Sequence, residues 1–294
     1  RADAPAILTV ARDRHAWCML RFSHDFEFWA ATCVRIKDKL SGRDIPFVLN
    51  RPQRRVLAVL EGMRVARRPI RLIMLKARQW GGSTLIQMYM AWIQCIHHRN
   101  WHSLICAHVK DTASTIRGMY TKMLACYPDE FWPDDSPHDF RPFERSVNTR
   151  VITGRDCRVT VGSSEGQEAV RGADYAMAHL SEVAFWKDSP TQSPEGFIRA
   201  ICGGIVRQPD TLIALESTAN GVGNYFHSEW LRSEDGRSDK AAVFVPWYEI
   251  DIYTAEVPDA EALWKSMSDY ERWLWQLGCT LDQIQWYREK LSEY

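Results

Sequence analysis

An apolar run that enters a glycine turn and continues into a helix is the feature that most constrains the fold of this chain. Residues 71–76 read RLIMLK, the pair Gly81-Gly82 permits a tight turn, and a helical pattern runs from Ser83 to about His97. At such a junction the backbone amides of the turn and the N-terminus of the helix direct partial positive charge toward one point. The segment therefore predicts a loop that binds phosphate groups.

The amino-acid sequence of this turn departs from that of the usual phosphate-binding loop, which reads Gly-x-x-x-x-Gly-Lys-[Ser/Thr]. In KARQWGGST (76–84), Lys76 stands at the first glycine position, Gly81 at the second and Gly82 at the lysine position. We expect Lys76 or Arg78 to supply the missing charge and Ser83 to offer its hydroxyl to Mg²⁺. A plain strand-to-helix turn with surface cations is the alternative. The candidate nucleotide-binding residues of the turn are Lys76, Ala77, Arg78, Gln79, Trp80, Gly81, Gly82, Ser83 and Thr84.

Short apolar runs alternate with helical segments along the middle of the chain. Residues 13–40 have an amphipathic helical pattern, residues 41–53 read as a loop before the next helix, and a further helix is expected to begin near Asp111. This alternation favours an α/β fold with a mainly parallel central sheet and helices on both faces. The runs expected to form strands are 71–76, 103–109, 157–164, 175–182, 211–218 and 241–247.

The tail of the chain has a different pattern. Ser268-Asp-Tyr-Glu271 and Thr280-Leu-Asp-Gln283 both match the capping box that begins a helix, and Gly278 can end the first of the two helices. The tail therefore predicts a helical pair over 269–294 that forms a small C-terminal subdomain. The acidic, proline-containing stretch 248–262 is the expected internal boundary.

A second strand end carries residues suited to hydrolysis. In AMAHLSEVAFW (176–186) the apolar run ends at Ser181 and Glu182. Nucleotide-hydrolysing α/β domains place an acid at such a strand end near Mg²⁺ and a glutamate after it to polarise the attacking water. Ser181 takes the place of that acid and cannot neutralise charge, while Glu182 is the candidate general base, a role that contributes roughly 10²–10⁴-fold to rate. The candidate metal ligands are Ser83, Ser181 and Glu182; the alternative is a solvated strand end.

A third strand end carries small hydroxyls and an amide. In LESTANG (215–221), the segment Ser217, Thr218, Ala219 and Asn220 can sense a γ-phosphate and pass that state to a neighbouring element. A polar turn capped by Asn220 is the alternative. Gln53 precedes Lys76 by 23 residues, and its amide can donate to and accept from the N6 and N7 edge of adenine. A glutamine at the start of a helix can also act simply as a cap.

Composition bounds the class of protein. The 37 basic and 37 acidic side chains cancel, so net charge gives no sign of nucleic-acid binding, although seven arginines gather in 51–71. Those arginines belong either to a solvated helix face or to contacts with polyanions. The eight cysteines show no CxxC pair or zinc spacing, which favours a reducing compartment. Since no apolar stretch approaches roughly 18 residues, no membrane span is expected.

Taken together in this order, the motifs resemble the ATPase part of the large terminase subunit of tailed bacteriophages, the motor that packages DNA into a procapsid. The resemblance extends from about Pro46 to the C-terminus. It implies a P-loop NTPase of the RecA/ASCE type that uses ATP and Mg²⁺ to drive translocation of double-stranded DNA. The segments that carry it are FVLNRPQ (47–53), KARQWGGST (76–84), AVRGADYAMAHLSEVAFW (169–186), ESTANGVGNYFHSEW (216–230) and GCTLDQIQWYREKL (278–291).

By position, the resemblance implies an adenine contact at Gln53, phosphate binding through 76–84 with Arg78 as the arginine of the turn, and Glu182 as the catalytic glutamate. It also implies coupling of hydrolysis to movement through 217–220. Arg171 matches a basic motif that contacts phosphates or a neighbouring subunit; a solvent-exposed loop arginine is the alternative.

The resemblance also implies partners and a location. Double-stranded DNA would be bound through its phosphates without sequence preference, and a portal protein, a small terminase subunit and further copies in a ring would be partners. The protein would act in the cytoplasm of an infected bacterium and be absent from the mature virion. We expect an ATPase domain at 1–247, with an N-terminal helical arm at 1–50 and the P-loop core at 51–247. A linker or lid at 248–294 would follow, without the C-terminal nuclease domain or its activity.

Two other functions remain open at this point. A nucleotide-gated DNA-binding or assembly module with little turnover is favoured by Gly82 and Ser181 and opposed by Glu182. A helicase-like DNA remodeller would need a second RecA-like domain, for which residues 246–294 are too short.

Overall fold

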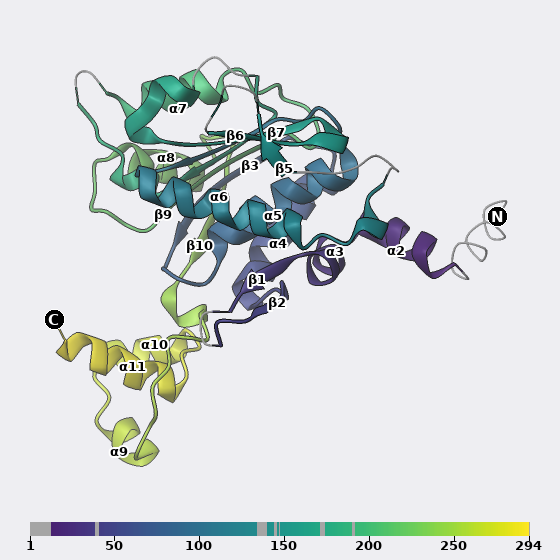
Figure 1. Cartoon of the computed structure of the whole chain (residues 1–294). Helices are drawn as coiled ribbons and strands as arrows, with labels where there is room; N and C mark the ends of the chain where they lie inside the picture. The colour runs from purple at the N-terminus through teal and green to yellow at the C-terminus, as the bar shows by residue number, and fades with distance from the viewer. Residues whose placement is uncertain are drawn as a thin grey trace.

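An eight-stranded sheet forms the centre of the molecule, in the order β10-β3-β9-β8-β4-β7-β6-β5 (Figure 1). The computed structural model describes residues 13–38, 41–133, 140–143, 146, 148–170, 174–189 and 192–293, with the backbone alone at 110–114 and 167–169. In this order, the strands from β10 through β3, β9, β8 and β4 to β7 run parallel to one another. At the other edge β6 pairs antiparallel with β7, and β5 pairs antiparallel with β6. The strands span β3 Ile70–Lys76, β4 Ser103–Ala107, β5 Phe140–Pro142, β6 Thr149–Ile152, β7 Cys157–Ser163, β8 Met177–Ser181, β9 Leu212–Ser217 and β10 Ala241–Val245.

All six apolar runs predicted as strands lie in this sheet, and the mainly parallel arrangement is confirmed. The short antiparallel strands β5 and β6 were not predicted. Short helical turns connect several elements, at Asp129–Phe131, Thr153–Arg155, Ser164–Val170, Val183–Phe185 and Trp247–Glu249.

Helices cover both faces of the sheet, as the sequence predicts. Leu72 and Met74 of β3 pack in one core cluster with α3, α4, α5 and α6, while Ile73 between them packs in a second cluster with α7 and α8. Alternate residues of a strand point to opposite faces, so one strand serves both cores. These helices span α3 Phe26–Cys33, α4 Arg51–Val65, α5 Gly82–Trp92 with a π-helical turn Ile93–His97 that continues it, α6 Lys110–Ala125, α7 Pro194–Cys202 and α8 Tyr225–Glu234.

The N-terminal part differs from its prediction. The single helix expected over 13–40 is instead α2 Arg14–Phe22 and α3, followed by strand β1 Arg35–Lys37. Asp13 and Asp25 each accept a hydrogen bond from the backbone three residues on, so each caps its own helix. The predicted loop contains β2 Asp44–Pro46, which pairs antiparallel with β1, and helix α4 already begins at Arg51.

Three helices form a separate lobe at the end of the chain, yellow in Figure 1: α9 Ala260–Lys265, α10 Asp269–Gln276 and α11 Leu281–Ser292. Both predicted capping boxes are present, and Gly278 follows α10 with a φ of +100°. The predicted helical pair is confirmed, and α9 was missed. The lobe has its own small core of Leu263, Met267, Leu274, Cys279 and Ile284.

All eight cysteines are free thiols. Within the described part of the chain, no helix combines the length and the apolar character needed to cross a membrane.

Candidate nucleotide site

The carboxyl ends of β3, β8 and β9 bring three sequence motifs together. Parallel strands end at the same edge of a sheet, and β9 lies between β3 and β8. In the strand register Glu216 of β9 stands beside Met74 on one side and Ser181 on the other. Lys76, Ser181-Glu182 and the segment that begins at Ser217 therefore meet at one place.

The turn between β3 and α5 requires glycine at Gly81. This residue has a φ of +80°, a left-handed conformation that L side chains rarely adopt, and it caps α5. A Cβ atom built on it would lie 2.7 Å from Nε2 of Gln53, which is closer than such contacts ever are. The turn is therefore tight because of its backbone and because of the side chain packed beside it.

Gln53 holds the turn through its side-chain amide. Its Nε2 donates to the carbonyl oxygens of Trp80 at 3.3 Å and Gly81 at 3.1 Å, and its Oε1 accepts from the backbone of Asn50 at 2.9 Å. Asn50 in turn donates to the Trp80 carbonyl at 3.0 Å and completes a capping box at the start of α4. Gln53 is thus a helix cap that also fixes the turn; its adenine contact stays a prediction.

Lys76 forms an ion pair with each of two carboxylates. Its Nζ lies 3.1 Å from Oε1 of Glu182 and 3.7 Å from Oε2 of Glu216. Burial lowers the pKa of Lys76, but the charges of the two glutamates outweigh burial, and the pKa stands above its ordinary value. Lys76 is therefore a permanent cation at the base of the turn.

Glu216 is a functional candidate that the sequence did not reveal. Its side chain is fully buried, and its Oε1 accepts hydrogen bonds from the hydroxyls of Ser83 at 2.5 Å and Ser181 at 2.8 Å. The ring Nε2 of His179 lies 3.2 Å from the same oxygen. Burial raises the pKa of Glu216, but Lys76, His179 and the Ser83 hydroxyl together hold it well below its ordinary value, so the carboxylate is ionised.

Glu182 touches the segment predicted to couple hydrolysis to movement. Its Oε2 accepts from the backbone amide of Thr218 at 3.2 Å, from the Thr218 hydroxyl at 3.3 Å and from the Ser217 hydroxyl at 3.4 Å. Asn220 donates to the carbonyl of Ala184 at 2.9 Å, while Ala219 is exposed. Glu182 has a φ of +54°, a conformation uncommon outside glycine that directs its side chain back over the strand ends.

The other predicted site residues lie around this centre. Arg78 is exposed, and its carbonyl accepts a hydrogen bond from the Tyr253 hydroxyl of the tail. Gln79 and Thr84 line a cavity beside the turn. Arg171 lies outside the described residues.

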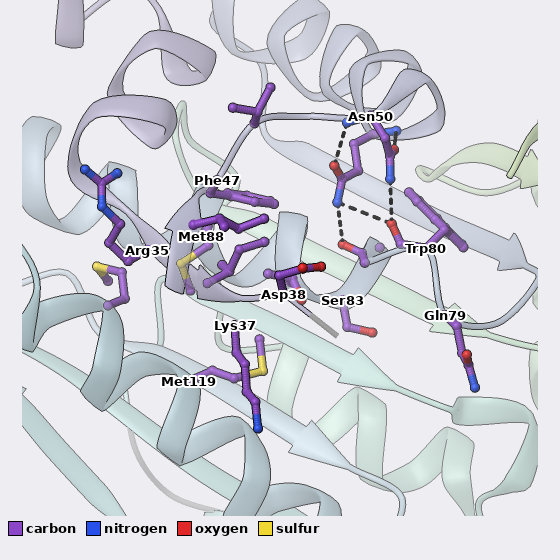
Figure 2. A pocket seen from close by; sticks show the side chains of 18 of the residues that line it. Arg35, Lys37, Asp38, Phe47, Asn50, Gln79, Trp80, Ser83, Met88 and Met119 are labelled. Atoms are coloured by element: carbon purple, nitrogen blue, oxygen red, sulfur yellow. Dashed lines mark hydrogen bonds between the residues drawn. The ribbon is translucent and has the colours of Figure 1, made fainter. Parts of the chain in front are cut away.

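A cavity of about 880 Å³ opens beside the turn (Figure 2). Its size suits a nucleotide, since pockets for small ligands and cofactors measure roughly 300–1,000 Å³. Besides the turn it is lined by apolar side chains of α5, α6 and the segment after β2, and by basic residues of the β1–β2 hairpin and α6: Phe47, Met88, Met119, Arg35, Lys37 and Lys122. The hairpin carries no motif, so only the tertiary structure could reveal that it belongs to the site.

The oxygen groups of the site fit Mg²⁺, a hard cation that prefers oxygen ligands. Ser83, Ser181 and Glu182 stand near the ends of β3, β8 and β9, and their role as ligands stays a prediction; Glu216 adds a buried oxygen, Oε2, that accepts no hydrogen bond. Among the described residues no three His, Cys, Asp or Glu side chains form an all-protein metal site. The set therefore fits a cation that takes its remaining ligands from phosphates and water.

The fold of this chain is similar to that of a solved protein. No protein-family model matches the chain, and no curated protein sequence matches it significantly. The HK97 bacteriophage large terminase, in contrast, superposes with a TM-score of 0.59 at 15% identity, over 85% of this chain and 50% of that one. This chain has the fold of a phage large terminase. It spans about half the length of that terminase.

Two further matches carry related names. The large terminase ATPase domain of Thermus phage P74-26 aligns at 15% identity and a TM-score of 0.40, over 75% of this chain and 95% of that one. The N-terminal domain of the DNA packaging ATPase from bacteriophage phi29 aligns at 14% identity and a TM-score of 0.43, over 68% of this chain and 96% of that one. The α/β terminase fold of this chain, with its mostly parallel sheet, is consistent with a P-loop NTPase.

Proposed function

We propose that this chain is the ATPase part of a DNA-packaging motor, which hydrolyses ATP to translocate double-stranded DNA into a procapsid. The observation that carries the proposal is the ion pair between Lys76 and Glu182, 106 residues apart, with Glu182 also held by Ser217 and Thr218. The residues proposed as the cation of the turn, the general base and the coupling segment thus contact one another, on a fold shared with a large terminase.

In this proposal the phosphates of ATP lie against the backbone amides of 76–84, with Lys76 and Arg78 as the neutralising cations. Mg²⁺, when bound, would neutralise the charge on the β- and γ-phosphates, with Ser83 as its hydroxyl ligand. Glu182 orients the attacking water and accepts its proton. Loss of the γ-phosphate then alters the contacts of Glu182 with Ser217 and Thr218, which moves the segment 217–220 and the lobe 248–294.

The partners follow from the same proposal. DNA would be held mainly through its phosphates, so binding would be independent of sequence and would weaken with salt. A ring of copies docked on a portal, loaded with the help of a small terminase subunit, would act in the cytoplasm of the infected cell. A cation such as Arg171, from the same chain or from a neighbour in the ring, would complete the site, an effect worth roughly 10³–10⁵ in rate where it operates.

A second candidate is a nucleotide-gated DNA-binding module with little turnover. It is favoured by the occupation of both carboxylate oxygens of Glu182, Oε1 by Lys76 and Oε2 by Ser217 and Thr218. A base held in this way must release a partner before it can orient water. A module of this kind would bind DNA differently with and without a non-hydrolysable ATP analogue.

The test is steady-state ATP hydrolysis over a range of protein concentrations. Glu182→Ala should lower the turnover by about 10²–10⁴-fold, the usual contribution of a general base. Glu195→Ala is the matched control, because Glu195 is an exposed glutamate of α7 that pairs with Arg199 on the surface. Turnover that depends on Glu182 and rises more than proportionally with concentration supports a motor whose site a neighbour completes. Nucleotide binding with turnover no higher than that of Glu182→Ala supports the second candidate, and no nucleotide binding contradicts both.

A further inference from the structure

The acid that is missing from β8 stands directly beside its expected place, on the neighbouring strand. Ser181 occupies the strand end where nucleotide-hydrolysing domains carry an acid next to Mg²⁺. In the parallel register of β8 and β9, its partner is Glu216. The carboxylate is thus displaced by one strand, not lost, and the hydroxyl of Ser181 donates to it at 2.8 Å.

Glu216 contacts the hydroxyl that a P-loop offers to Mg²⁺. Its Oε1 accepts from Oγ of Ser83, which also lines the nucleotide-sized cavity. Because the hydroxyl hydrogen points at Glu216, the lone pairs of Ser83 Oγ are free to point at a cation on its other side. A buried carboxylate beside a metal ligand fixes the orientation of that ligand and strengthens its hold on the metal.

The charge balance of the buried cluster favours a cation. Two carboxylates, those of Glu182 and Glu216, share the single ammonium of Lys76, with the imidazole of His179 beside them. The second oxygen of Glu216, Oε2, is fully buried, accepts no hydrogen bond and lies 3.7 Å from Nζ of Lys76. The side chain of Glu182 is 30% exposed, but that of Glu216 is fully buried, and a buried negative charge is costly unless a positive charge balances it.

We infer that Glu216 is the acid of the magnesium site. From β9 it positions Ser83 and balances the charge of Mg²⁺, the role that an acid at the end of β8 has in other nucleotide-hydrolysing domains. The inference rests on the proposed function, because it presumes that the turn binds Mg²⁺ with a nucleotide. Glu216 is a positioning residue that acts through Ser83 and by its charge.

The experiment measures the apparent affinity for Mg²⁺ in the presence of a fluorescent, non-hydrolysable ATP analogue, together with the affinity for the analogue in EDTA. Glu216→Gln should weaken the apparent Mg²⁺ affinity by about 10- to 100-fold, as loss of a supporting ligand partner usually does. Binding of the analogue in EDTA should be unchanged or tighter, because the loss of a negative charge reduces the electrostatic repulsion of the phosphates. The Ser181→Asp/Glu216→Gln variant, which returns one carboxylate to β8, should recover most of the Mg²⁺ affinity.

Glu229→Gln is the matched control, because Glu229 is another buried glutamate that pairs with a lysine, Lys240 at 2.9 Å, but lies on α8 away from the turn. It should leave the apparent Mg²⁺ affinity unchanged. Should Glu216→Gln not fold, the double variant still decides, since it keeps the buried charge: Mg²⁺ affinity near that of the wild type supports the inference, and weak affinity overturns it.

Different results would contradict the role of Glu216 and the proposed function. The inference is overturned if Glu216→Gln binds Mg²⁺ as tightly as the wild type does in the presence of the analogue. It is also overturned if Glu229→Gln loses as much Mg²⁺ affinity as Glu216→Gln, because Glu216 then has only a structural role. If the wild type binds no nucleotide with or without Mg²⁺, the proposed function itself is wrong.

Discussion

At the scale of single residues, the indole of Trp80 explains why residue 82 is glycine and not lysine. A Cβ atom on Gly82 would lie 2.5 Å from Cζ2 of Trp80, whose side chain is buried and whose Nε1 donates to the carbonyl of Ala77 at 3.1 Å. Any side chain at position 82 therefore requires the indole to move. On the proposed function, the turn would take its charge from other residues, such as Lys76 at the end of β3, because a side chain at position 82 would meet the indole.

Gly82→Ala should accordingly destabilise the protein. A methyl group inserted into a filled site costs about 1–3 kcal/mol, because neighbouring side chains must leave their preferred positions. We expect this loss in the free energy of unfolding measured with urea, together with weaker nucleotide binding, since the turn shifts with Trp80.

Gly62→Ala is the matched control for that substitution. Gly62 lies on the exposed side of α4, and nothing lies within 4 Å of a Cβ built on it. Alanine there should raise the stability by about 0.5–1 kcal/mol, since glycine is unfavourable inside a helix. Equal stability changes in the two variants would contradict the role given to Trp80.

Single residues of the candidate site were predictable from the sequence where they stand directly at the end of an apolar run. Lys76 and Glu182 stand at the ends of recognisable strands, and the structure places them 3.1 Å apart. Glu216 was passed over although it lies in a quoted segment, because its importance depends on the lateral register of β8 and β9. That register is set by tertiary packing and leaves no local pattern in the sequence.

At the scale of elements, prediction succeeded where periodicity and capping signals agreed. Six strands and both capping boxes of the tail follow from local patterns, whereas the helix predicted over 13–40 is broken at Asp25. Helix α2 is amphipathic and α3 is mostly apolar, and Asp25 marks the break by capping α3. The hairpin of β1 and β2 is too short to give a periodic signal, yet it lines the cavity.

The pairing of α10 with α11 gives the tail a specific sensitivity to acid. Arg288 of α11 donates two hydrogen bonds to Glu271, at 2.6 and 2.9 Å, and Ser268 donates a third at 2.7 Å. Led by the bonds from Arg288, these contacts lower the pKa of Glu271 from 4.5 to about 2. Since the pKa is lower in the folded state, the stabilisation is complete above about pH 4.5 and is lost as the pH falls toward 2.

Glu271→Gln should remove this part of the pH dependence. At pH 7 the variant should be less stable by roughly 1.5–3 kcal/mol, the range for hydrogen bonds to a charged group. Its deficit relative to the wild type should shrink as the pH falls from 4.5 toward 2. Urea unfolding at several pH values, followed by circular dichroism, measures the difference.

Glu261→Gln serves as the control, because Glu261 belongs to an exposed i,i+4 pair with Lys265 on α9, and such pairs contribute about 0.3–0.5 kcal/mol. A deficit for Glu271→Gln that stays constant between pH 7 and pH 2.5 would refute the proposed linkage.

At the scale of the whole molecule, a short series of contacts joins the turn at 76–84 to the C-terminal lobe. The hydroxyl of Tyr253 donates to the carbonyl of Arg78 in the turn, and its ring stacks on Trp286 of α11 with centroids 4.7 Å apart. Trp286 in turn packs against Trp247 at 5.3 Å, where the chain leaves β10. One hydrogen bond and one ring stack thus connect the turn with α11.

Binding of a non-hydrolysable ATP analogue to the wild type should, on the proposed function, slow amide hydrogen exchange in peptides of α11, because an ordered turn holds Tyr253 and, through it, Trp286. Tyr253→Phe keeps the ring stack but removes the hydrogen bond. It should bind the analogue nearly as well as the wild type does and lose most of the added protection in α11. Tyr270→Phe, a half-exposed tyrosine of the same lobe, is the control and should retain it. Protection of α11 that survives in Tyr253→Phe would mean that the lobe senses the nucleotide by another route, such as the contact of Ile252 with the cavity.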